Sequence, residues 1–190
     1  MTIHTPGVPA QDEYAEWYAG YVARVPDRDI IAALASQPDD LESLVGVVPE
    51  ESTTFRYAED KWSIRQLVGH LIDGERVFAL RALCFSRGDA ASLPGFDENA
   101  YIASSAYDDA PCSELRREFR ALRDANTSML GRLGTEQWDR RGTASGYAIS
   151  VRALAYIMVG HPRHHMSVIA ERYLPPLDIT AARLSWMKGA

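Results

Sequence analysis

The stretch VRALAYIMVGHPRHH, residues 151–165, is an apolar segment with helical spacing that carries three of the chain's five histidines. Its inward stripe runs through Leu154, Met158, His161 and His165 in alternating steps of three and four residues. Side chains at positions i and i+4 of a helix point the same way, about 5–6 Å apart at Cβ. Because neutral imidazole is the commonest protein ligand for metals, His161 and His165 are a candidate pair of metal ligands.

A third imidazole is available in SIRQLVGHLIDGE, residues 63–75. Ser63 and Gln66 form a capping-box pattern, which predicts that a helix begins here and places His70 about two turns inside it. Gly74 lies one turn beyond His70 and leaves room beside it. We therefore expect His70 to face the same interior space as the histidines of residues 151–165.

A single histidine on an apolar face is usually a hydrogen-bonded core residue, but several imidazoles buried together are costly unless they share a partner. His70, His161 and His165 are thus predicted to bind one divalent metal ion, with Zn²⁺ or Ni²⁺ favoured. His164 is an alternative to His165, although it drifts toward the flank of the stripe. Pro162 is expected to free the Met158 carbonyl and to kink the helix.

The fold predicted from periodicity and caps is all-α, a four-helix bundle formed by residues 1–190 as one domain. Residues 1–11 are expected to be poorly ordered, and residues 12–24 to form a short amphipathic piece. The long helices are expected over residues 27–48 (interrupted near Pro38), 63–87 (closed by Gly88), 113–133 (capped by Ser113 and ended at Gly134) and 150–174. No convincing alternating strand is found.

Two connections, residues 88–112 and 139–149, are longer than packing requires. Loops beyond about 15 residues in a compact domain often cover functional sites, so the first could close one end of the bundle. An equally good interpretation is a long structural crossover.

Composition excludes several classes of function. The formal net charge of −6 and the absence of a Lys/Arg run argue against nucleic-acid binding. Arg116, Arg117, Arg120 and Arg123 are interleaved with acidic residues, which predicts a solvated helix face.

No apolar run approaches the ~18 residues of a membrane helix. Without a signal-peptide pattern or a cysteine framework, a reduced cytoplasmic location is expected.

Three blocks of sequence resemble the DinB/YfiT-like family. They are KWSIR (61–65) through His70 and Glu75-Arg76, PGFDE (94–98), and SVRAL (150–154) through Gly160-His161 with His164-His165. The resemblance implies a four-helix bundle, often a homodimer, with one metal ion on His70, His161 and His165. It also implies a metal-dependent hydrolase or a transferase that uses a low-molecular-weight thiol.

A metal held by three neutral imidazoles keeps its positive charge and an open position, which is typical of catalytic rather than structural sites. Water or a small thiol could ionise there and attack a small-molecule substrate. Asp73, one turn from His70, is a candidate catalytic base or orienting carboxylate, or else an exposed helix charge. The alternative function is a non-catalytic metal-binding protein of the stress response.

Overall fold

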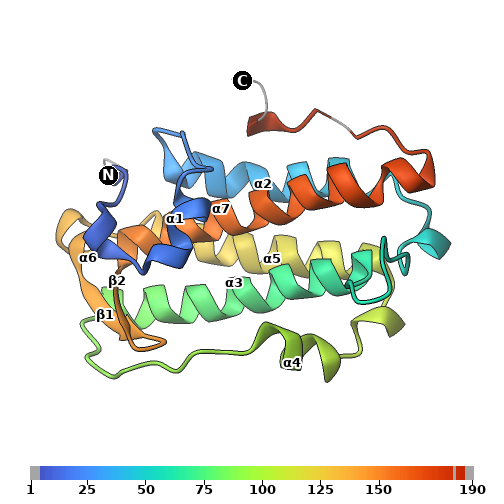
Figure 1. The fold of residues 1–190 in the computed structure, drawn as a ribbon. Coiled ribbons are helices and arrows are strands. Elements are labelled where there is room, and N and C mark those ends of the chain that lie inside the picture. Colours follow the sequence, from blue (N-terminus) through green and yellow to red (C-terminus); the bar gives the residue numbers. More distant parts are fainter. Residues whose placement is uncertain (1–4, 182, 187–190) are drawn as a thin grey trace.

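The structure, a computed structural model, describes residues 5–181 and 183–186. Four long helices form a bundle (Figure 1), which confirms the predicted fold class: α2 (Ile30–Val45), α3 (Ile64–Ser86), α5 (Cys112–Leu130) and α7 (Val151–Val168). Helices α2 and α3 each pack against both α5 and α7. The order around the bundle is therefore α2, α5, α3, α7, so helices that are consecutive in sequence lie on its diagonals at two of the three connections.

Short elements complete the chain. Helix α1 (Ala19–Val22) packs on α7, α4 (Glu98–Ala103) lies along α3, and α6 (Thr135–Asp139) precedes a hairpin of β1 (Arg141–Ala144) and β2 (Tyr147–Ser150). Six shorter helical pieces, one of them π-helical at Ile169–Tyr173, extend the ends of these elements or link them; the other five are Gln11–Glu13, Glu16–Tyr18, Glu50–Ser52, Tyr107–Asp109 and Pro175–Leu177. No helix within the described ranges is long and apolar enough to cross a membrane.

The helix caps follow the sequence in part. Ser63 caps α3 by accepting from the Gln66 amide, and the Gln66 side chain accepts from the Ser63 amide, as the capping box predicts. The predicted Ser113 cap is wrong, because α5 begins at Cys112 with Pro111 at the N-cap. Proline suits that position since it has no N–H to leave unpaired.

The β-hairpin was not predicted from the sequence. Its turn residues Ser145 and Gly146 have φ values of 55° and 83°, the left-handed pair that two-residue hairpin turns need. In the preceding connection, the Leu93 amide donates to the Thr143 carbonyl and the Leu93 carbonyl accepts from the Ser145 amide. Leu93 therefore forms an isolated β-bridge alongside β1. Strands of four residues are too short to show a clear alternation, and the Ser-Gly dipeptide was the available signal.

A polar layer crosses the middle of the bundle between two apolar clusters. One cluster lies toward the hairpin and the other toward the opposite end. Each long helix has a buried polar residue between the clusters: Gln37 on α2, Glu75 on α3, Arg123 on α5, and His161 on α7. His70 lies five residues before Glu75 on α3, among residues of the second cluster, and its ring contacts His161, so the histidines adjoin this layer.

Arg123 corrects the expectation of a solvated arginine face on α5, because its side chain is 0% exposed. The guanidinium donates to Glu75 at 2.8 Å, to the Met158 carbonyl at 2.8 Å, and to Gln37. Helix α7 continues through Pro162, which cannot donate to Met158, so Arg123 supplies the bond that this carbonyl loses. The buried arginine thus stabilises the proline-containing turn that presents His161.

Of the N-terminal segment that was predicted to be poorly ordered, residues 1–4 lie outside the described residues. From Thr5 onward the chain runs over the bundle, with Pro6 and Pro9 buried. The carboxylate of Glu13, itself 3% exposed, bonds to Ser150 and Arg152 at the start of α7. This segment carries Trp17, Tyr18 and Tyr21 to the face where the histidines lie.

Candidate metal centre

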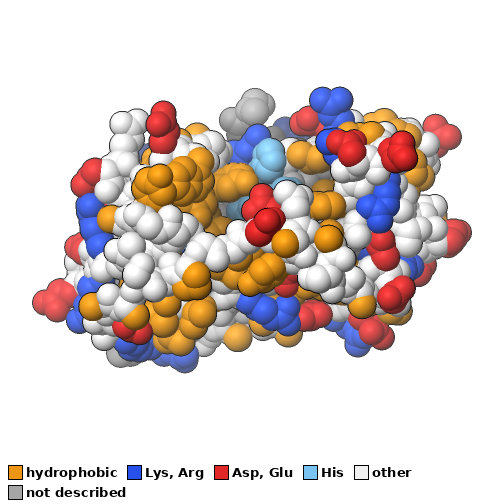
Figure 2. Space-filling model, turned by 60° about the horizontal axis from the view of Figure 1, so that its bottom comes forward, with side chains coloured by type: hydrophobic (Ala, Val, Ile, Leu, Met, Phe, Trp, Pro, Cys, Tyr) orange, Lys and Arg blue, Asp and Glu red, His pale blue; other side chains and the backbone are white. Residues whose placement is uncertain are grey.

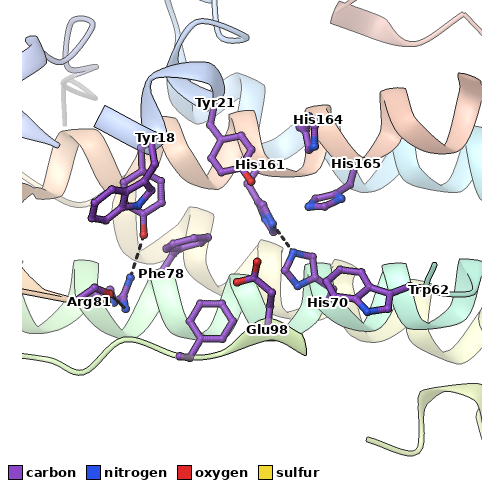
Figure 3. A pocket seen from close by; sticks show the side chains of 13 residues that line it. Tyr18, Tyr21, Trp62, His70, Phe78, Arg81, Glu98, His161, His164 and His165 are labelled. Carbon is purple, nitrogen blue, oxygen red and sulfur yellow. Dashed lines mark hydrogen bonds between the residues drawn. The ribbon is translucent and has the colours of Figure 1, made fainter. Parts of the chain in front are cut away.

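Three histidines from two helices meet in the middle of the bundle. One ring nitrogen from each of His70, His161 and His165 lies within 4.8 Å of the others. The Nε2 atoms of His70 and His161 are 2.8 Å apart, and the three ring centroids are mutually 4.7 Å apart. Figure 3 shows His70 rising from α3 toward the two rings that descend from α7.

Burial keeps these imidazoles neutral. Desolvation lowers the pKa of His70 from its ordinary value to about 4, with a smaller effect of nearby His164. Desolvation first, and then the neighbouring histidines, hold the pKa of His161 and of His165 well below the usual range. Each ring therefore keeps a lone pair near neutral pH, which is the form that binds a metal.

Glycines make the close approach possible. A Cβ built on Gly74 would lie 2.9 Å from Cε1 of His161, so a side chain there would displace the ring. A Cβ on Gly160 would meet the Tyr21 carbonyl oxygen at 2.0 Å, and one on Gly69 would overlap the Tyr107 ring. The glycines that precede His70 and His161 therefore allow other groups to approach the backbone closely.

The histidines open onto a pocket of about 470 Å³. Figure 2 shows histidine side chains, in pale blue, in a hollow bordered by hydrophobic side chains. Aromatic residues from several segments form much of its wall: Trp17, Tyr18, Tyr21, Trp62, Phe78 and Phe96. The 88–112 connection contributes Phe96 and Glu98, so this long segment borders the pocket.

The other two candidate residues, Asp73 and His164, are not members of the three-histidine cluster. Asp73 is half-buried and is not among the residues that line this pocket; its Oδ1 accepts from the Tyr107 hydroxyl at 2.7 Å. Its catalytic role stays a prediction. His164 does line the pocket but lies beside the cluster, with its ring centroid 4.9 Å from that of His165.

The donor set fits a divalent cation. His165 Nε2 and His70 Nδ1 are buried with no hydrogen-bond partner among the described residues, and an unpaired buried nitrogen is normally satisfied by an ion, a ligand or water. Three neutral nitrogen donors suit borderline cations of the Zn²⁺ and Ni²⁺ type better than hard ones such as Mg²⁺. The pocket beside the rings leaves space for a further ligand.

Sequence reasoning missed Arg81, which is 2% exposed and lines the pocket. The signal was its spacing, because eleven residues after His70 bring a helix back to nearly the same face. Glu98 was seen only as part of a loop motif, yet its carboxylate points toward the histidines in Figure 3. As the first residue of α4, Glu98 is positioned by Asp97, whose side chain caps that helix.

The sequence and the four-helix bundle place this chain in a known class of protein. The sequence model of the DinB superfamily matches residues 33–169, and the chain belongs to that superfamily. Among solved structures it is similar to "YfiT from Bacillus subtilis", described as "a probable metal-dependent hydrolase with an unusual four-helix bundle topology". The likeness covers 75% of this chain and 82% of that one, with a TM-score of 0.70 and 23% identity, and it shows the shared fold. No curated protein matches the chain.

Proposed function

We propose that this protein binds one divalent metal ion through His70, His161 and His165 and uses it to catalyse a reaction of a small molecule. The observation that carries the proposal is that three neutral imidazoles meet on the wall of a pocket of about 470 Å³, with one ring nitrogen of each within 4.8 Å of the others. A closed structural site would need a fourth protein ligand, and three donors beside a pocket leave a position for substrate.

A bound cation would supply Lewis acidity, lowering the pKa of a nucleophile such as water or a small thiol. The protein's own contribution is to hold three lone pairs in place and to restrict the surroundings. The ring centroids of Trp62 and His70 are 4.8 Å apart, and those of Tyr21 and His161 are 5.4 Å apart. Both imidazoles are therefore packed against an aromatic ring. Ligands held in this way need little reorganisation when substrate arrives.

A carboxylate at the pocket is suited to handle protons. Glu98 points toward the histidines (Figure 3) and could accept a proton from the attacking nucleophile or return one to the leaving group. Asp73 does not line the pocket, and its carboxylate accepts a hydrogen bond from Tyr107. We therefore assign it a role in orienting His70, from the next turn of the same helix. Both assignments belong to this proposal.

Two reactions could use the same metal site, and they differ in the nucleophile. Hydrolysis of an ester or amide would use water, and S-transfer would use a small thiol and an electrophile. The similar protein YfiT is described as a probable metal-dependent hydrolase, which favours testing hydrolysis first. The exposed mouth of the pocket admits either partner from solvent.

The test begins with metal binding. Metal-free protein titrated with Zn²⁺ or Ni²⁺ in a calorimeter should bind one ion, and His70→Ala, His161→Ala and His165→Ala should each lose stoichiometric binding. The matched control is His164→Ala, which removes an imidazole from the same pocket but should keep the ion. Loss of binding in His164→Ala with retention in His165→Ala would show that the ligand pair on α7 is wrongly assigned.

Activity is then measured with a panel of nitrophenyl esters and with a small thiol plus an aryl halide, with and without metal. We expect metal-dependent turnover that falls by orders of magnitude in His70→Ala and less steeply in Glu98→Gln. A second candidate function, non-catalytic metal binding, is favoured if the ion raises the melting temperature while neither panel shows turnover.

A further inference from the structure

A buried cation lies at the end of the pocket away from the histidines. The Arg81 guanidinium is in a side chain only 2% exposed, and Nη2 donates to the Pro94 carbonyl at 2.9 Å and to Ser145 Oγ at 3.1 Å. Nη1 makes a long contact of 3.5 Å with the Tyr18 hydroxyl. These bonds use three of the five guanidinium N–H groups, and all three acceptors are uncharged.

Arg81 differs in this respect from the other buried arginines. Arg123 pairs with Glu75, and Arg163 pairs with Asp27. Within residues 5–181 and 183–186, no ion pair joins Arg81 to a carboxylate. Since burying a charge without a counter-charge is unfavourable, the missing partner points to an anion that arrives with a ligand.

The geometry links Arg81 to the candidate metal centre. His70 and Arg81 are eleven residues apart on α3, so they lie on nearly the same face with their Cα atoms about 16 Å apart. Figure 3 shows Phe78 between them, and it shows Glu98 closer to the histidines than to Arg81. The pocket is therefore elongated, with imidazoles at one end, a guanidinium at the other and aromatic walls between them.

We propose that Arg81 anchors the carboxylate of an elongated organic acid whose opposite end lies at the three histidines. The inference deepens the proposed function, because it names the chemical class of the substrate for the same site. A guanidinium presents a planar fork that matches a carboxylate. Tyr18 and Phe78, whose ring centroids are 6.2 Å apart, provide apolar surface for the chain between the two ends.

A purely structural role predicts something different. If Arg81 served as a clamp alone, fixing the Pro94 carbonyl to the hairpin turn through Ser145, the charge of a ligand would not matter. The test is therefore a charge comparison made on metal-free protein, because a carboxylate could otherwise bind to the metal itself.

Binding of phenylbutyrate is compared by calorimetry with binding of its neutral amide and of phenylbutyl phosphate. We expect wild-type protein and His70→Ala to bind the carboxylate at least about tenfold more tightly than the amide, as charge-assisted hydrogen bonds predict. Arg81→Gln should lose this preference. Ser145→Ala removes a partner of Arg81 but keeps the cation, and it should retain the preference.

Equal binding of acid and amide to wild-type protein, or a preference that survives in Arg81→Gln, would overturn the proposal. Tighter binding of the phosphate than of the carboxylate would overturn the proposal of an organic acid and assign a phosphate monoester to Arg81 instead. If Arg81→Gln does not fold, wild-type crystals soaked with phenylbutyrate decide: a carboxylate on Arg81 supports the proposal, and one elsewhere overturns it. Metal titration of the same samples separates failure of this anion site from failure of the metal centre.

Discussion

Replacing Arg123 by Met should destabilise the fold far more than replacing any exposed arginine of α5. The change leaves the Glu75 carboxylate, in a side chain 1% exposed, without its ion pair and removes a donor from the Met158 carbonyl. Breaking a buried pair by removing one partner costs about 3–5 kcal/mol. For a chain of this size that corresponds to a fall in melting temperature of roughly 6–20 °C.

The matched control lies one turn earlier on the same helix. Arg120 pairs with Asp39 at 2.6 Å, but the two side chains are 41% and 77% exposed, and an exposed pair contributes about 0.2–1 kcal/mol. Urea unfolding of wild-type protein, Arg123→Met and Arg120→Met, followed by circular dichroism at pH 7.5, gives the two free-energy differences directly.

A second substitution checks the cause. Adding Glu75→Gln to Arg123→Met removes the stranded buried charge, so the double variant should recover part of the lost stability. Should Arg123→Met unfold at the same urea concentration as Arg120→Met, the polar layer does not act as argued. A double variant less stable than Arg123→Met would likewise refute the explanation based on a stranded carboxylate.

The remaining predictions concern the site and assembly. Gly74→Ala should weaken Zn²⁺ binding at least about tenfold, because its Cβ would lie 2.9 Å from His161 Cε1, whereas Gly20→Ala, with nothing within 4 Å of its Cβ, should leave the titration unchanged. The lowered pKa of His70, about 4 in the folded protein, means that the unfolded chain binds more protons, so metal-free stability should fall as pH drops from about 6.5 to 4. His70→Ala should show a shallower fall in urea titrations across that range, and an equal slope would contradict the assignment. Light scattering should give a homodimer of about twice 21.1 kDa, and a mass of one chain would refute that expectation.

Much of the fold could be predicted because its signals are local. The Ser63 cap and the apolar periodicity of residues 151–165 are set by neighbours within four residues, and the structure agrees with both. The prediction for α5 began one residue late and ended three residues late, because helix boundaries depend on one or two residues, here Pro111 and Gly131. The hairpin was missed because its strands are too short for a two-residue period to show.

The residues of the candidate site could be predicted where helical spacing sets their positions, and not where tertiary contacts do. His161 and His165 share a face by spacing alone, and His70 has its own capped helix. Glu98 comes from a connection whose path is fixed by contacts with the bundle, and no sequence period reports such a path. Asp73 has the right spacing from His70, but the Tyr107 hydroxyl is hydrogen-bonded to it from outside its helix.

Arg123 shows how the fold and the site depend on each other. Its neighbours in sequence are acidic residues and other arginines, and only its spacing of four residues from Phe119 indicates the inner face. The groups that accept its hydrogen bonds come from α2, α3 and α7, which no local pattern reports. Desolvation is the largest cause of the lowered pKa of His161, and the Arg123 cation adds to the same effect. A positive charge held inside the bundle disfavours a second one on the imidazole. The residue that repairs the helix at Pro162 therefore also helps to keep His161 neutral, with a lone pair available for a metal.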